Sequence, residues 1–399
     1  MSAVVVVGAG IVGSSVAYHL ARRGVPVTLL EQGPAPAAGV TGDSFAWVRG
    51  SGGHWPGGAQ DLREYVLADY RRLEAELPHI AVRRTGSLSW ADTPAQDSPP
   101  GPGQFRIGRR DIAGLEPNLR HPPDQAIHTP SDAGVDPTAL THVLVAAAGA
   151  HGATVLHETA ATSLHVANGR VQGVLTSTGC HAAATVVLAA GAGVPRLCEP
   201  LSADLPMTAS PATLARVTAP SGLVKTIVAR PHFEVREVRE GELLMVVPHV
   251  EGTAAREQAA QDALRRMKAA FQGSDQCRLL GHRTGRRPMP AHGPVIGYAT
   301  RDRSVYVAVM HSAITLAPTV GRLIADELVT GRACGRSSWP GRRARAAVAS
   351  SGCTGCPGTA RRCRPRPPRR CAPGRTGPTS TPGGLRIRRT VRCTWGAGG

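Results

Sequence analysis

Three glycines near the N-terminus have the spacing Gly-x-Gly-x-x-Gly, in the segment Gly8-Ala9-Gly10-Ile11-Val12-Gly13. In this pattern the first glycine permits a tight turn, the second lets the backbone approach a pyrophosphate, and the third lets a helix pack close to a strand. A helix that begins there offers free N–H groups and partial positive charge to phosphates. Glu31 lies 18 residues beyond Gly13 and can accept hydrogen bonds from ribose hydroxyls. These residues predict a dinucleotide site.

The elements around this glycine loop, residues 8–13, are those that the site needs. Residues 3–7 form an apolar β-branched run, which is typical of a buried parallel strand. Residues 14–23 predict a helix, and 25–30 predict a second strand that ends in Glu31. Strand, glycines, helix, strand and acid in this order indicate a nucleotide-binding βαβ unit. They do not decide between NAD and FAD.

Later segments favour FAD. Residues 185–188 predict a buried strand that ends in the small residues Ala190 and Gly191, which let a strand end sit against a nucleotide. Residues 304–309 predict another strand, followed by the loop 311–318 and a helix over 319–330. The free N–H groups at the start of that helix are expected to face a flavin pyrimidine ring. An NAD-dependent dehydrogenase, the weaker alternative, would not need this segment.

Together these residues resemble the D-amino acid oxidase group of FAD-dependent oxidoreductases, which includes glycine oxidase and sarcosine oxidase. The matching pieces span roughly residues 1–332 and are VVVVGAGIVGSSVAYHLARRG with Glu31, RRTGSL, AGVDP, VVLAAGA, RPMPAHGPVIG and VMHSAITLAP. The resemblance implies an α/β fold with a Rossmann-like FAD-binding domain and a smaller α+β substrate domain that contains an antiparallel sheet. It predicts a discontinuous FAD-binding domain of residues 1–82, 131–200 and 286–332, and a substrate domain of residues 83–130 and 201–285.

The resemblance also implies roles for individual residues. Arg287 stands where glycine oxidase holds a substrate carboxylate, and His311 is expected near the substrate; a structural role remains the alternative for both, and Arg283 and Arg286 compete with Arg287. The hairpin of 232–236 and 243–247 is expected to form part of the substrate roof. No metal site is expected. The predicted cofactor-binding residues are Gly8, Ala9, Gly10, Ile11, Val12, Gly13, Glu31, Gln32, Thr41, Ser44, Phe45, Ala161, Ala190, Gly191, Ser312, Ala313, Ile314, Thr315 and Leu316.

The reaction implied is oxidation of a carbon–nitrogen bond of an amino acid or secondary amine by hydride transfer to flavin. Oxygen or an electron-transfer partner then reoxidises the flavin. We favour noncovalent FAD, because no cysteine stands where the sarcosine-oxidase branch forms its flavin bond. Two departures, His292 for an Asp and Ala313 for a Gly, keep open a flavin-binding relative without turnover. The Ala313 methyl is expected to crowd the flavin if its φ is positive.

Composition separates the last 67 residues from the rest. Residues 333–399 carry 15 Arg and no Lys, Asp or Glu, so the net charge of +18 falls to +3 without them. With almost no large apolar residues, this tail is predicted to be disordered. Its interpretation stays open between an out-of-frame or non-functional extension, a segment that binds nucleic acid, and a zinc site at Cys353 and Cys356 with Cys363 and Cys371. Nucleic acid is the less favoured partner. The body has no apolar run long enough for a transmembrane helix and no signal peptide, which predicts a cytoplasmic protein without a membrane partner.

Overall fold

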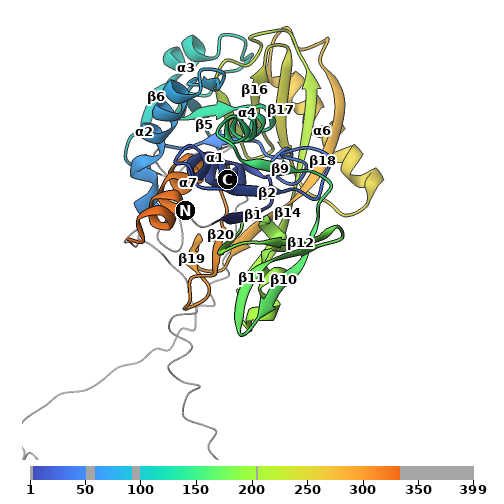
Figure 1. The fold of residues 1–399 in the computed structure, drawn as a ribbon. Coiled ribbons are helices and arrows are strands. Elements are labelled where there is room, and N and C mark those ends of the chain that lie inside the picture. The colour runs from blue at the N-terminus through green and yellow to red at the C-terminus, as the bar shows by residue number, and fades with distance from the viewer. Residues whose placement is uncertain (1–2, 51–58, 92–98, 204, 333–399) are drawn as a thin grey trace, which may run out of the picture. The chain divides into compact units, whose positions relative to one another are not determined.

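The computed structural model describes residues 3–50, 59–91, 99–203 and 205–332 (Figure 1). The predicted disorder of 333–399 and the alternatives for that tail lie outside these residues. The glycine loop belongs to a six-stranded sheet with the order β19-β20-β13-β1-β2-β9. The strands β20, β13, β1, β2 and β9 are parallel, and β19 joins β20 antiparallel. The strands of this sheet are β1 (Val4–Val7), β2 (Val27–Leu30), β9 (Thr154–Leu156), β13 (Thr185–Leu188), β19 (Val295–Tyr298) and β20 (Val305–Val309).

Successive side chains of the six-stranded sheet enter two different cores, because neighbouring residues of a strand point to opposite faces. Val4 and Val6 of β1 pack into a core with residues of the helices, whereas Val5 and Val7 pack into a core with a small three-stranded sheet. This two-sided burial explains the continuous apolar run. The helices are α1 (Ile11–Ala21), α2 (Gln60–Glu76), α4 (Pro137–Ala150) and α7 (Ala313–Thr330). The small sheet consists of β10 (Ala161–Ala167), β11 (Arg170–Thr176) and β12 (Gly179–Ala182). After β13 comes the helix α5 (Val194–Cys198), with one short 3₁₀ turn before it and one after it.

A second large sheet has eight strands in the order β18-β14-β17-β16-β15-β5-β7-β6. All neighbours pair antiparallel except β15 and β5. One face carries Val235, Met245 and Ala215, which form a core with Leu264 and Met267 of α6 (Thr253–Ala270). The strands are β5 (Ser87–Ser89), β6 (Phe105–Gly108), β7 (Gln125–Thr129), β14 (Met207–Thr218), β15 (Ile227–Arg230), β16 (Phe233–Arg239), β17 (Glu242–Val247) and β18 (Arg278–Pro290), with α3 (Arg109–Leu115) after β6.

The fold confirms the predicted α/β architecture with an antiparallel sheet, including the hairpin at Glu240 and Gly241. A third sheet joins segments far apart in the sequence, in the order β3-β8-β4, with β3 (Trp47–Val48), β4 (Val82–Arg83) and β8 (Ala133–Val135). The predicted boundaries between an FAD-binding and a substrate domain stay a prediction.

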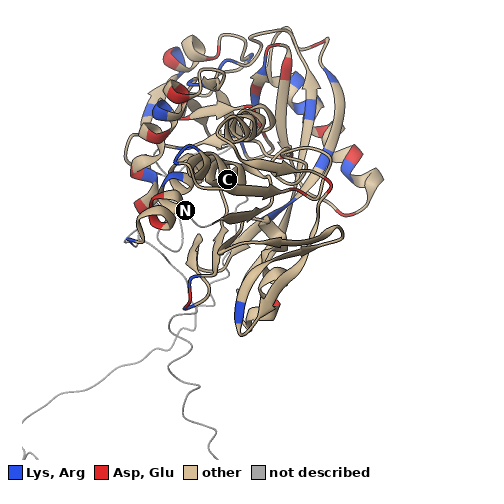
Figure 2. Cartoon of the chain, viewed as in Figure 1, with Lys and Arg blue, Asp and Glu red and all other residues tan. Residues whose placement is uncertain are grey.

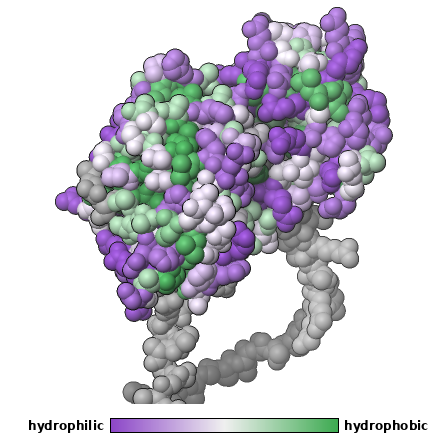
Figure 3. Space-filling view, turned by 45° about the vertical axis from the view of Figure 1, so that its right-hand side comes forward, coloured by the Kyte–Doolittle hydropathy of each residue, from purple (hydrophilic) through white to green (hydrophobic). Residues whose placement is uncertain are grey.

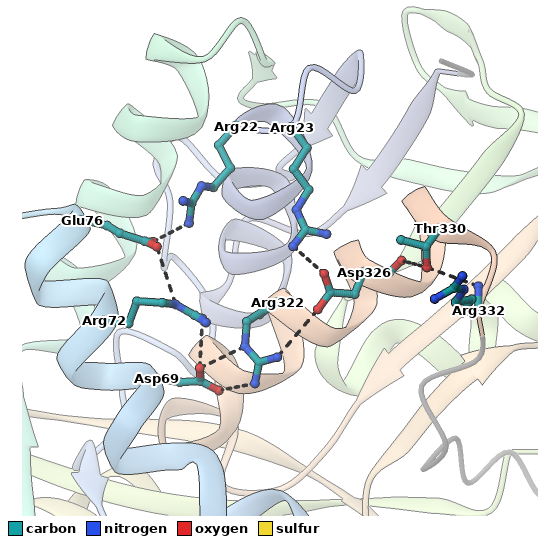
Figure 4. A network of polar contacts seen from close by, with 9 residues as sticks. All are labelled: Arg22, Arg23, Asp69, Arg72, Glu76, Arg322, Asp326, Thr330 and Arg332. Carbon is teal, nitrogen blue, oxygen red and sulfur yellow. Dashed lines mark hydrogen bonds and ion pairs between the residues drawn. The ribbon is translucent and has the colours of Figure 1, made fainter.

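A network of charged side chains connects α1, α2 and α7 (Figure 4). Asp69 of α2, whose side chain is 5% exposed, accepts two hydrogen bonds from Arg322 of α7, at 3.0 and 2.9 Å. Arg72 lies 2.9 Å from the same carboxylate, and Arg22, the C-cap of α1, contacts Glu76 of α2 at 2.5 Å. The network therefore fixes the three helices that stand over one face of the nucleotide sheet.

Charged residues lie mainly on the outer helices and on the eight-stranded sheet, while β1, β2 and β20 carry none (Figure 2). On the surface, apolar residues form patches separated by hydrophilic side chains (Figure 3). Among the described helices, none is long and apolar enough to cross a membrane.

Candidate functional site

The predicted cofactor residues gather at one edge of the six-stranded sheet. The glycine loop follows β1, Glu31 follows β2, Ala190 and Gly191 follow β13, and Ser312 stands three residues beyond β20. These strands are parallel, so their carboxyl ends meet at the same edge, where open α/β sheets bind ligands. Ala161 lies on β10, five residues beyond the last strand of that edge, β9.

Close packing explains the glycines of the loop. Gly8 has a φ of 102°, and a Cβ there would lie 2.8 Å from the carbonyl oxygen of Ala189. A Cβ on Gly13 would lie 2.0 Å from the Gly8 oxygen, and one on Gly10 would lie 3.1 Å from Thr41 Oγ1. Side chains are thus excluded around the start of α1, where Gly10 is the N-cap and provides no side-chain cap. The loop fits a pyrophosphate held by backbone N–H groups.

Glu31 holds this edge together. Its Oε2 accepts a hydrogen bond from Ala9 N–H and its Oε1 accepts one from Gly33 N–H, both at 2.8 Å. The carboxylate is buried, while the neighbouring Gln32 is exposed. Each carboxylate oxygen accepts more than one hydrogen bond, so Glu31 can hold the loop and still receive ribose hydroxyls.

The segment 41–48 closes over the glycine loop. Thr41 Oγ1 accepts a hydrogen bond from Ile11 N–H at 3.2 Å, which occupies one N–H group at the start of α1. Ser44 Oγ accepts from Ala46 N–H, which places it in a local turn. Phe45 belongs to the same segment, and its carbonyl oxygen accepts from Arg236 of β16 at 2.6 Å.

Arg236 was not predicted as a site residue. It is 2% exposed, and it also donates to the carbonyl oxygen of Val135 on β8, at 2.6 Å. Burial lowers its pKa to about 9, while Asp136 acts in the opposite direction. Its sign in the sequence is the alternation of Phe233-Glu234-Val235-Arg236, which puts two charged residues on one face of a strand whose other face is apolar. Arg236 therefore connects the eight-stranded sheet to the segment around Phe45.

The start of α7 differs from its prediction. The helix begins at Ala313, not at Thr319, and Pro318 lies inside it. A proline donates no hydrogen bond to the carbonyl four residues earlier, here that of Ile314. The hydroxyl of Tyr70 donates to this carbonyl at 2.6 Å instead, so the buried carbonyl keeps a hydrogen bond although Pro318 has no N–H. The free N–H groups therefore belong to the turn that begins at Ala313 and includes Ile314 and Thr315, whereas the N–H of Leu316 donates to the Ser312 carbonyl oxygen at 3.2 Å.

Arg287 and His311, the two predicted catalytic residues, share one environment. Arg287 lies on the edge strand β18 opposite Ser210, to whose Oγ it donates at 3.1 Å. Its Nε is buried without a hydrogen-bond partner in the described part of the chain. Burial, together with the Arg287 charge, lowers the pKa of His311 to about 4, so the imidazole is neutral at pH 7. Arg283 and Arg286, the competitors, are exposed.

Trp47 borders the same region from the β3 side. Its indole donates to Asp132 Oδ2 at 2.9 Å, and the guanidinium of Arg49 stacks 3.9 Å from its ring. The carbonyl oxygen of Trp47 accepts from Thr315 Oγ1 at 2.9 Å, which connects β3 to the start of α7. Neither Arg49 nor Asp132 was predicted, because their proximity depends on the pairing of β3 with β8.

The family of FAD dependent oxidoreductases known as DAO matches residues 3–327. The chain belongs to this DAO family. At 26% identity over 376 residues, it is similar to the uncharacterized oxidoreductase YurR of Bacillus subtilis, covering 83% of this chain and 96% of that protein. It is also 26% identical to glycine oxidase of Pseudomonas aeruginosa, over 82% of this chain and 95% of that one. The solved glycine oxidase of Bacillus cereus has the same fold, with a TM-score of 0.74 at 21% identity over 83% of this chain and 96% of that chain.

Membership of the DAO family makes FAD the nucleotide of the site, and the alternative of an NAD-dependent dehydrogenase is set aside. The glycine loop, the doubly bonded Glu31 and the start of α7 fit FAD. The condition under which the Ala313 methyl would crowd the flavin is not met. Ala313 is helical, and the positive φ of 55° belongs to Ser312, so the Ala313 methyl adds no backbone strain. His292 is exposed in a turn before Gly293.

Among the described residues, no group of three or more His, Cys, Asp or Glu side chains could hold a metal ion. The cysteines of this part are unpaired. Cys198 and Cys277 are buried, and burial raises the pKa of both thiols, that of Cys198 to about 12. Cys180 is exposed on β12.

Proposed function

We propose that this DAO-family chain oxidises the carbon–nitrogen bond of an amino acid or secondary amine, with oxygen or an electron-transfer partner as the final acceptor. The observation that carries the proposal is Arg287, a half-buried guanidinium whose Nε is buried without a partner among the described residues, beside a neutral His311. When bound, FAD supplies the two-electron oxidant for the carbon–nitrogen bond.

The residues of the chain bind and orient the substrate. Arg287 grips a carboxylate, since a planar guanidinium in a site of low dielectric constant holds it through two parallel hydrogen bonds. This fixes the α-carbon in one orientation. His311 stays neutral at physiological pH, because its burial and the neighbouring arginine both disfavour a second positive charge. Because the His311 imidazole is neutral, the Arg287 guanidinium is the cation that faces the carboxylate.

We also propose that FAD is bound noncovalently. The buried Cys198 and Cys277 have raised pKa values and contribute to the apolar cores, so neither supplies a thiolate.

Anaerobic mixing of the FAD-loaded full chain with a panel of amino acids tests the reaction. We expect flavin absorbance to bleach with at least one of them. Arg287→Met should raise the concentration for half-maximal reduction at least about 100-fold, because each of the two charged hydrogen bonds lost contributes roughly 1.5–3 kcal/mol. Arg286→Met is the matched control, since this neighbour is exposed on the other face of β18. Equal effects of both variants would contradict the role given to Arg287.

A further inference from the structure

The strands β14 and β18 extend as a two-stranded ribbon, residues 207–212 and 285–290, beyond the rest of the eight-stranded sheet. β17 pairs with residues 213–218 of β14, whereas residues 207–212 pair with β18 alone in the described part of the chain. At the end of the ribbon, Ala291 N–H donates to the carbonyl oxygen of Pro206 at 3.0 Å. β18 also contacts the 3₁₀ turn Gly191–Gly193, which follows β13. The ribbon therefore reaches the carboxyl edge of the six-stranded sheet, where the predicted cofactor residues gather.

One face of β18 is directed toward residues 40–43, at the start of the segment that closes over the glycine loop. Arg283 Nε lies 3.2 Å from Asp43 Oδ1. A Cβ on Gly285 would lie 2.8 Å from Val40 Cγ2. Residues an even number apart on a strand share a face, so Arg287 projects from the same face as these two residues of β18. The Arg287 guanidinium therefore lies on the side of the sheet that faces the cofactor edge.

Ser210 of β14 stands directly opposite Arg287 on this face of the ribbon. Its Oγ accepts a hydrogen bond from Arg287 Nη2 at 3.1 Å, and this is the only hydrogen bond of the guanidinium to a described residue. A guanidinium has several N–H groups in a fixed plane, so the others stay available to a ligand. One of them is Nε–H, which is buried. Ser210 therefore restrains the rotation of the guanidinium and leaves most of its donors free.

A proline follows each member of this pair in the sequence, Pro211 after Ser210 and Pro288 after Arg287. A proline ring excludes the residue before it from the helical region, so both backbones are held extended. Prolines in sheets are confined to strand edges, and Pro211 lies in the part of β14 that β17 does not reach. An arginine loses rotamer freedom when it binds a ligand, and a guanidinium that is already held loses less. The ribbon therefore presents Arg287 in one orientation before a ligand arrives.

We propose that Ser210 is a positioning residue, which holds the Arg287 guanidinium in the orientation that receives the substrate carboxylate. Ser210 acts through Arg287 and makes no contact of its own with the reacting atoms. This inference rests on the proposed function, because it concerns how the same site binds its carboxylate.

Binding of acetate and acetamide tests the inference without turnover, because the two probes have nearly the same shape and only acetate carries a charge. Both are titrated into the FAD-loaded full chain and followed by flavin absorbance and calorimetry. Ser210→Ala should weaken acetate about fivefold, as expected for the loss of one hydrogen bond, and should leave acetamide unchanged. Equal or tighter acetate binding by Ser210→Ala, an equal loss for acetamide, or no acetate binding by the wild type would overturn the proposal.

Two further variants separate positioning from a structural role. Ser210→Thr keeps the hydroxyl that accepts from Arg287, so it should bind acetate as the wild type does. Thr208→Ala is the matched control, since it removes a hydroxyl from the same face of β14 at an exposed residue that makes no hydrogen bond to Arg287. Acetate binding should be unchanged in this control. If Ser210→Thr bound acetate as weakly as Ser210→Ala, or if Thr208→Ala weakened acetate equally, the role of Ser210 would be refuted.

Amino acids and acetate together distinguish this inference from the proposed function. If amino acids bleach the flavin and Ser210→Ala leaves the concentration for half-maximal reduction unchanged, the inference about Ser210 alone fails. If acetate affinity depends on Ser210 as predicted but no amino acid bleaches the flavin, only the proposed reaction is contradicted.

Discussion

Replacing Gly13 by alanine should separate the packing of the glycine loop from ordinary helix propensity. Both Gly13 and Gly149 lie inside helices, α1 and α4, where alanine is favoured over glycine by about 1 kcal/mol. A Cβ on Gly149 meets nothing within 4 Å, so Gly149→Ala should stabilise the protein by roughly 0.5–1 kcal/mol. A Cβ on Gly13 would lie 2.0 Å from the Gly8 oxygen, which is backbone and cannot rotate away.

The Gly13 clash requires α1 to move away from β1 by more than an ångström. Overpacking of this kind costs about 1–3 kcal/mol, and more where backbone must move, so Gly13→Ala should be destabilised by at least about 2 kcal/mol. Urea unfolding with a common m-value measures both variants. Because the displaced oxygen belongs to the glycine loop, FAD affinity should also fall at least about tenfold, which fluorescence titration reports. A Gly13→Ala variant as stable as Gly149→Ala, with unchanged FAD affinity, would refute the close packing described for this loop.

Three further predictions concern residues that support the site. Asp69→Asn removes the carboxylate held by two arginines and should cost about 3 kcal/mol in urea unfolding; a loss below about 0.5 kcal/mol would show that the network is not stabilising. Burial lowers the pKa of His19 to about 3, so its contribution to stability is complete above pH 6.5 and is lost as the pH falls toward 3. Between pH 7 and pH 5 the free energy of unfolding should fall by about 2 kcal/mol because of His19. His19→Gln should remove this part of the pH dependence, whereas a substitution of the exposed His79, His79→Gln, should leave it unchanged. Tyr70→Phe leaves the buried carbonyl of Ile314 without its donor and should cost about 1–2 kcal/mol by thermal and urea unfolding; an unchanged stability would mean that Pro318 needs no compensation.

Local patterns made the nucleotide sheet predictable from the sequence. The apolar runs that became β1, β13 and β20 are buried on both faces, and the glycine loop needs its strand and helix on either side. The start of α7 was placed six residues late, because a proline within a predicted loop argues against helix and only a distant residue, Tyr70, compensates for it.

The polar residues of the site were harder to predict than the fold. Glu234 and Arg236 lie on β16 and Arg49 directly follows β3, so their orientation depends on strand register and on the pairing of β3 with β8. A one-residue slip of β16 would turn Glu234 and Arg236 into the apolar core. Arg287 could be predicted because the Arg-Pro motif resembles that of a known family. The residues that surround it in the fold could not be predicted in this way.

The visible absorption spectrum of the purified full chain, reconstituted with FAD and then titrated anaerobically with amino acids, tests the central claim most directly. We predict flavin bands at one FAD per chain and their bleaching by at least one amino acid. Flavin bands that persist with every amino acid would contradict the proposed oxidation, and a protein that remains colourless after reconstitution would contradict the FAD site itself.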